Sequence, residues 1–76
     1  MKQFLEYLLS QIVDDQKELV VEEISIEENS FQYNIKAAQS DIGKIIGKDG
    51  KIIQAIRSVA KILAVKENIR VRIQLA

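Results

Sequence analysis

The first pattern along the chain is an amphipathic helix. Between residues 2 and 14, apolar side chains recur at the spacing of one helix face, namely Phe4, Leu5, Leu8, Leu9, Ile12 and Val13. This spacing predicts a helix that ends near Asp14-Asp15.

Two strands are predicted next. Residues 18–28 are rich in β-branched and acidic side chains, and residues 31–38 alternate between apolar and polar positions, with Phe31 and Tyr33 on the apolar face. Asn29-Ser30 between them predicts a tight turn, so the pair is expected to form a hairpin. Glu22-Glu23 interrupts the alternation of the first strand, which predicts a bulge or a twisted edge there.

The second half of the chain predicts two helices and a last strand. Ser40 is expected to be the N-cap of a short helix over residues 41–46, and a longer helix is expected from about Gly50 to about Val65. Residues 69–75 alternate, which places Ile69, Val71, Ile73 and Leu75 on a core face and Arg70, Arg72 and Gln74 on an open face.

The element order is therefore α-β-β-α-α-β, which predicts an α+β fold in one domain over residues 1–76. We expect a three-stranded mixed sheet with all helices on one face. The helical crossover allows the second and third strands to lie parallel and adjacent.

Composition argues against an enzyme. The 76 residues include no Cys and no His, so the commonest metal ligand and general base are missing, and no paired carboxylates lie near a hydroxyl nucleophile. We expect no catalytic residue, metal or cofactor. Glu6 and Ser10 interrupt the first apolar segment, unlike a signal peptide, and no apolar run approaches the roughly 20 residues of a membrane helix. A cytoplasmic protein without membrane contact is expected.

The formal net charge of zero hides two opposite halves. Residues 1–39 contain three lysines and eight carboxylates, or −5, whereas residues 40–76 contain eight basic and three acidic residues, or +5. Such asymmetry predicts a polyanion-binding surface in the basic half. Two ordinary solvated surfaces are the alternative that charge alone leaves open.

All three glycines lie between residues 43 and 50. Gly47 and Gly50 fall at the predicted junction of two helices, where the missing Cβ atoms let another backbone approach closely. Free amides and the dipole of the longer helix attract phosphate there, and Lys44, Lys48 and Lys51 add positive charge. Asp49 is expected to cap the helix.

A nucleotide-binding P-loop does not fit this segment. Three residues, not four, separate Gly43 from Gly47, and Asp49 follows the lysine where a hydroxyl for magnesium is required. The dinucleotide fingerprint fails as well, because no G-x-G occurs.

The longer helix is apolar over an unusually wide arc. A stripe of Ile52, Ile56, Val59 and Leu63 has further apolar residues on both flanks, namely Ile53, Ala60 and Ala64 on one side and Ala55 and Ile62 on the other. The arc spans about 200°, more than a helix on a sheet needs. We assign Ile52, Ile56 and Leu63 to the core and expect another part of the arc to line a groove or meet a partner.

The segment Ile46-Gly47-Lys48-Asp49-Gly50-Lys51-Ile52-Ile53 strongly resembles the I-G-x-x-G-x-x-I motif of KH domains. The element order resembles the type II, bacterial arrangement of that fold, and nearly the whole chain is similar to the KhpA family of short, stand-alone bacterial KH proteins. The resemblance implies a GxxG loop that clamps the backbone of about four nucleotides of single-stranded RNA or DNA.

The resemblance also implies an RNA-binding site made of Gly43, Lys44, Ile46, Gly47, Lys48, Asp49, Gly50, Lys51, Ile53 and Arg57. In it, Ile46 and Ile53 form the floor of an apolar groove, and Arg57, one turn further, reaches a base edge or a phosphate. Because stacking aromatics are missing, we expect weak RNA binding with little sequence specificity.

Dimerisation is the other implication of the resemblance, either with a second copy or with a larger KH-containing protein. Ala55, Val59 and Ile62 are the expected interface residues. The implied role is that of a post-transcriptional regulator or RNA chaperone. The alternative is a dimerisation module that keeps the fold and no longer binds RNA.

Overall fold

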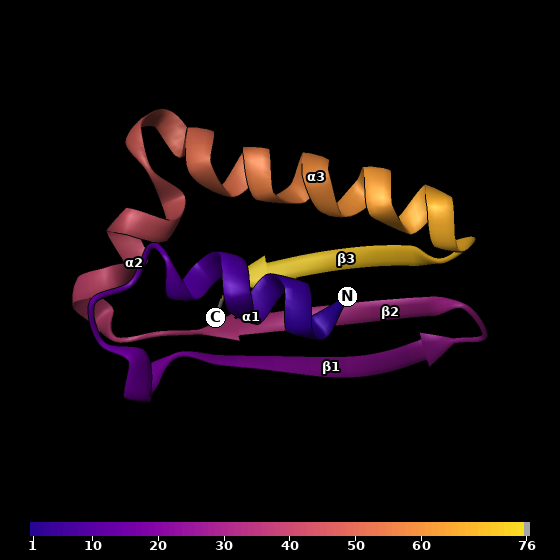
Figure 1. Cartoon of the computed structure of the whole chain (residues 1–76), viewed down its shortest axis with the longest axis horizontal. Coiled ribbons are helices and arrows are strands. Elements are labelled where there is room, and N and C mark those ends of the chain that lie inside the picture. Colours follow the sequence, from indigo (N-terminus) through magenta and orange to yellow (C-terminus); the bar gives the residue numbers. More distant parts are fainter. Residues whose placement is uncertain (76) are drawn as a thin grey trace.

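The structure, a computed structural model, describes residues 1–75 (Figure 1). Its main elements are α1 (Lys2–Ser10), β1 (Val20–Glu27), β2 (Ser30–Lys36), α2 (Gln39–Ile46), α3 (Lys51–Glu67) and β3 (Arg70–Leu75), with 3₁₀ turns at Gln16–Glu18 and Lys48–Gly50. The predicted α-β-β-α-α-β order and the α+β class are confirmed. Among residues 1–75, no helix is long and apolar enough to cross a membrane.

The strands form one mixed sheet in the order β1-β2-β3. β1 runs antiparallel to β2, and β3 lies parallel to β2, with Phe31 opposite Val71 and Tyr33 opposite Ile73. The expected parallel pairing across the helical crossover is therefore confirmed. β3 is an edge strand, and this position brings its outer rim next to α3 (Figure 1).

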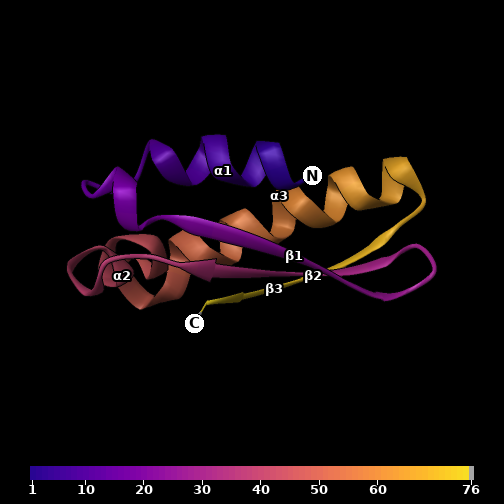
Figure 2. The same ribbon diagram turned by 90° about the horizontal axis from the view of Figure 1, so that it is seen from below.

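One cluster of buried side chains joins all three helices to the same face of the sheet. It contains Leu5 and Leu9 of α1, Ile45 of α2 and Ile53, Ile56 and Ala60 of α3, packed against Val21, Tyr33, Ile35 and Ile73 of the strands. Figure 2 shows that the side of β3 facing away from α1 carries no helix. The predicted faces of the last strand are confirmed, since Arg70, Arg72 and Gln74 are exposed.

Several boundaries differ from the sequence predictions. α1 ends at Ser10, yet Val13 is still buried because the following turn folds back on the core. The hairpin turn comprises Glu28 and Asn29, while Ser30 already belongs to β2. α2 begins at Gln39 with Ala38 as its N-cap, so the assignment of Ser40 as cap is wrong.

The bulge expected at Glu22-Glu23 is also wrong. Glu23 pairs in register with Tyr33, and the irregularity of the hairpin lies between Ser25 and Glu27. The hydroxyl of Tyr33 donates a hydrogen bond of 2.7 Å to Glu23 Oε1. Because this acidic side chain has a partner on the inner face, the strand continues without a break.

Candidate nucleic-acid interface

The glycine-rich segment forms a tight turn between α2 and α3. Gly47 has φ 76° and ψ 174°, a region that only glycine populates readily, and Gly50 is left-handed with φ 73° and ψ 14°. A Cβ atom on Gly47 would lie 2.5 Å from Ile52 Cγ1, whereas one on Gly50 would meet nothing within 4 Å. Gly47 therefore allows the turn to pack directly against the first turn of α3.

Two backbone amides of this turn are available to a ligand. The N–H of Gly47 donates to the Gly43 carbonyl at 2.9 Å, and the N–H of Gly50 donates to the Gly47 carbonyl at 3.1 Å. No backbone carbonyl of residues 1–75 accepts from the amides of Lys48 or Asp49. At the positive end of the α3 dipole, these two amides are suited to bind a phosphate.

Asp49 does not cap α3, contrary to the prediction. Gly50 is the N-cap of this helix, and no side chain donates to or accepts from its first turn. Asp49 is itself left-handed, with φ 58° and ψ 25°, and its side chain is exposed. The cap assignment failed because α3 starts at Lys51, which makes Gly50 the N-cap and leaves Asp49 one residue before that position.

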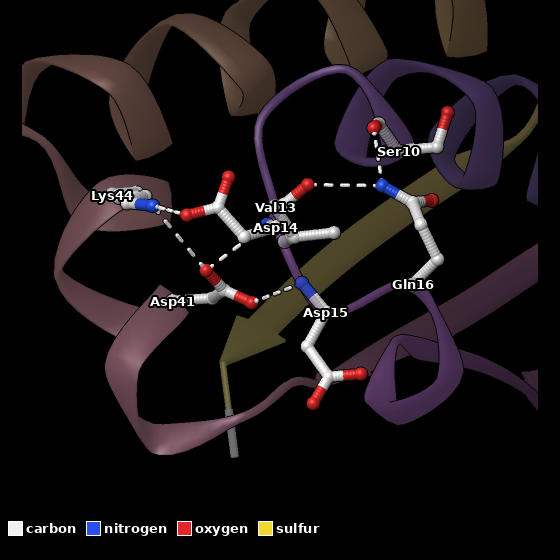
Figure 3. Close-up of polar contacts among 7 residues, drawn as sticks. All are labelled: Ser10, Val13, Asp14, Asp15, Gln16, Asp41 and Lys44. Atoms are coloured by element: carbon white, nitrogen blue, oxygen red, sulfur yellow. Dashed lines mark hydrogen bonds and ion pairs between the residues drawn. The ribbon is translucent and has the colours of Figure 1, made fainter.

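A buried carboxylate anchors α2, the helix that leads into the turn (Figure 3). Asp41 is 1% exposed, and its two oxygens accept the amide hydrogens of Asp15 at 3.0 Å and Asp14 at 3.1 Å. These bonds, the one from Asp15 foremost, hold the pKa of Asp41 below its usual value of 3.8. The link ties the start of α2 to the segment that follows α1.

Lys44 belongs to the same anchor. Its ammonium group binds the carboxylate of Asp14 and lies 3.7 Å from Asp41 Oδ1, as Figure 3 shows. The hydrogen bond with Asp14 raises the pKa of Lys44 above its ordinary value. Lys48 and Lys51, in contrast, form no ion pair with any residue from 1 to 75. Of the three lysines predicted to surround the turn, these two have uncompensated charges.

A groove of about 640 Å³ runs between α3 and the edge strand β3. The ten described residues that line it are basic, apolar or amide-bearing, and none is acidic or aromatic: Arg57, Lys61, Ala64, Val65, Ile69, Arg70, Val71, Arg72, Ile73 and Gln74. Arg57 Nη2 donates to the Ile73 carbonyl at 3.3 Å, so the guanidinium lies against the edge strand. The groove combines an apolar floor with four cations.

The predicted groove floor differs from the one observed. Ile53 is 7% exposed and lies in the core, whereas Ile52, which we assigned to the core, is 39% exposed. The buried row of α3 continues through Ala60 and Ala64, whose small side chains let this side approach the sheet most closely. Ile46, at the end of α2, is 37% exposed and so remains accessible beside the turn.

Of the four basic residues that line the groove, the site predicted from the sequence contains Arg57 and does not contain Lys61, Arg70 and Arg72. Alternation along the last strand placed both arginines on an exposed face. The alternation does not give the order of the strands in the sheet. Because β3 is an edge strand, its exposed arginines lie next to the flank of α3 that carries Arg57 and Lys61.

The predicted interface residues Ala55, Val59 and Ile62 are exposed, and Ile52 extends their row along α3. None of the four lines the groove. At 100° per residue, this exposed row and the pair Arg57 and Lys61 lie on opposite sides of the buried row. The two surfaces of α3 can therefore be occupied at the same time.

Comparisons with known proteins agree with the motif. A family model described as "KhpA/KhpB, KH domain" matches residues 2–75. The "RNA-binding protein KhpA" of Clostridium acetobutylicum is 45% identical over 99% of both chains. Proteins of the same name from Chlamydia trachomatis and Borreliella burgdorferi are 37% and 33% identical, covering 99% and 96% of this chain and 95% and 88% of their own. No solved structure gives a significant match.

Proposed function

Because the chain belongs to the KhpA/KhpB family of KH domains, we propose that it binds single-stranded RNA through the turn Gly47–Gly50 and the groove between α3 and β3. The observation that carries the proposal is a groove along α3 with four basic side chains and no acidic one among its described residues, together with two free amides in the turn before the same helix. A single-stranded polyanion with apolar bases matches both features.

Each part of the site has a distinct role in this proposal. The amides of Lys48 and Asp49 hold one phosphate, and the ammonium groups of Lys48 and Lys51 add electrostatic attraction. Gly43 and Gly47 shape the turn, since the Gly43 carbonyl accepts the Gly47 amide. Lys44, held by Asp14, contributes chiefly by fixing α2.

Binding of this kind is weak and reads sequence poorly. No aromatic side chain lines the described part of the groove, so bases contact only aliphatic side chains and the peptide edge of β3. Phosphate contacts position a strand without distinguishing its bases. We therefore assign the protein to general RNA binding, as a post-transcriptional regulator or RNA chaperone.

A second copy, or a larger KH-containing partner, pairs with α3 in this proposal. Ile52, Ala55, Val59 and Ile62 follow the three-four-three spacing of a helix seam, and Val59 is 41% exposed. Ser58, next to the middle of this row on the solvent side, is uncharged, and the lysines that adjoin the row, Lys51 and Lys66, lie at its two ends. Two grooves on one RNA raise the affinity through effective concentration.

Gly50 is the position at which the phosphate clamp is tested most cleanly. We compare Gly50→Asp with Gly50→Asn, because both residues tolerate a left-handed backbone and a Cβ atom there meets no neighbour. The two side chains have nearly the same size, but the aspartate is negatively charged and the neutral asparagine can donate a hydrogen bond. A carboxylate beside the bound phosphate should weaken binding of a four-nucleotide oligouridylate by on the order of tenfold relative to the asparagine variant.

Fluorescence anisotropy with labelled RNA gives the affinities, and circular dichroism verifies that both variants are folded. Equal affinities for Gly50→Asp and Gly50→Asn would exclude a phosphate at the turn. If the wild-type protein does not bind the oligonucleotide at all and still dimerises, the KH fold serves here as a dimerisation module.

A further inference from the structure

A second hollow adjoins the groove across the edge strand. It measures about 320 Å³ and is bordered by residues of the β1–β2 hairpin, among them Glu27, Ser30 and Phe31, together with Arg70, Val71 and Arg72. The same three residues of β3 also line the groove. Arg70 and Arg72 thus stand where the two hollows meet.

These arginines have charges that the protein itself does not neutralise. Neither forms an ion pair within residues 1–75, and both are exposed. Across the sheet, Arg70 lies opposite Ser30 and Arg72 opposite Gln32, which are neutral. Glu27 is the one acidic residue among the described residues of the second hollow.

Arg70 lies far from the glycine turn. The turn precedes the N-terminal end of α3, whereas Arg70 follows the C-terminal end of this 17-residue helix, which is about 25 Å long (Figure 1). A strand that is clamped at the turn and follows the groove along α3 therefore reaches Arg70 last.

We infer that an RNA strand leaving the groove crosses β3 at Arg70 and Arg72 and continues into the second hollow. The ligand is the same single strand, extended by further nucleotides whose phosphates the two guanidinium groups bind. The inference rests on the proposed function of the groove and adds a second contact that the GxxG motif does not contain.

The test compares four-nucleotide and ten-nucleotide oligouridylates. The longer RNA offers more registers to a clamp of about four nucleotides, which alone strengthens binding about sevenfold. For the wild-type protein, the ratio of the two affinities (the length ratio) should exceed about seven. Arg70→Gln with Arg72→Gln should return the length ratio to about sevenfold. For the longer RNA, the slope of log affinity against log salt should also fall in magnitude by about 1.4, since each phosphate contact on a single strand contributes roughly 0.7.

A charge-matched control is Lys2→Gln with Lys17→Gln, which removes two exposed positive charges from the acidic half of the chain. It should leave the length ratio unchanged. Glu27→Gln provides the opposite perturbation. Removal of this carboxylate from the second hollow should strengthen binding of the longer RNA and leave the shorter one unaffected.

The outcomes separate the two proposals. If the arginine variant keeps the wild-type length ratio and salt slope, the strand does not cross β3 there. Because Arg70 and Arg72 also line the groove, the extension is read from the length ratio and not from binding of the four-nucleotide RNA alone. An equal loss for both RNA lengths would place the arginines in the clamp itself and overturn the extension. Failure of the wild-type protein to bind either RNA would overturn the proposed function.

Discussion

Substituting the three glycines by alanine, one at a time, should change stability by amounts that follow from their backbone geometry. Gly43 lies inside α2, where a Cβ atom meets nothing within 4 Å. Alanine there should stabilise the protein by about 0.5–1 kcal/mol, because glycine loses more conformational freedom on folding. Gly50→Ala should cost about 1–2 kcal/mol, the ordinary penalty of a left-handed alanine.

Gly47→Ala should be the most damaging of the three. Its backbone lies in a glycine-only region, at a cost of about 1–3 kcal/mol. The added Cβ atom would also lie 2.8 Å from Ile52 Cβ, an atom whose position follows from the α3 backbone and cannot be changed by side-chain rotation. We expect a total loss of about 3 kcal/mol or more, a large fraction of the stability of a domain of this size.

Thermal and urea unfolding followed by circular dichroism measure these differences. For a domain of this length, 1 kcal/mol corresponds to about 6 °C in Tm. We therefore expect a rise of about 3–6 °C for Gly43→Ala, a fall of about 6–12 °C for Gly50→Ala and a fall of almost 20 °C or more for Gly47→Ala. A loss at Gly47 no larger than that at Gly50 would refute the reasoning, since it would mean that the turn relaxes away from Ile52.

Three further predictions concern the rest of the molecule. Asp41→Asn should lower the Tm at pH 7, and the difference from wild type should shrink as the pH falls below 3.8. The reason is that the pKa of Asp41 is lowered in the folded protein, so its contribution to stability is complete above 3.8 and is lost at lower pH. A difference in Tm that does not change with pH would contradict this. Val59→Glu should weaken dimers, which sedimentation would show as a lower sedimentation coefficient, and an unchanged profile would count against the α3 interface. Lys61→Glu, on the flank of α3 that lines the groove, is the control and should impair RNA binding instead. Asn68→Ala should lower the free energy of unfolding in urea by about 1 kcal/mol and Asn68→Gly should lower it little or not at all, because Asn68 ends α3 in a left-handed conformation with φ 57°. Equal stability of the two variants would argue against a left-handed cap.

Much of the fold could be predicted from local pattern. The three- and four-residue spacing of α1 and α3 and the alternation of β2 and β3 are properties of adjacent residues, so they identify the elements and their order. The glycine spacing likewise indicated the turn between α2 and α3. Boundaries were less certain, as Ser10 and Gln39 show, because the ends of helices depend on what they pack against.

The site could be predicted only in part. Gly47 and Gly50 were identifiable because their conformations exclude most other residues, and Arg57 because it lies one turn beyond the motif. The partners of Asp41 lie 26 and 27 residues away in the chain, and no spacing rule joins positions that far apart. The burial of this carboxylate could therefore not be predicted from the sequence.

The sequence by itself determined the elements, the inward and outward faces of β2 and β3 and the glycine turn, since each depends on neighbouring residues. Tertiary structure decided which side of α3 is buried, because Ile52 and Ile53 are equally apolar and only the packing of the helix on the sheet, with Ile56 and Ala60 in the core, buries one of them. It also made β3 an edge strand, which brings Arg70 and Arg72 beside Arg57. The groove between α3 and β3 forms from two surfaces that meet only when the chain has folded. Its four positive charges could therefore not be predicted from either surface alone.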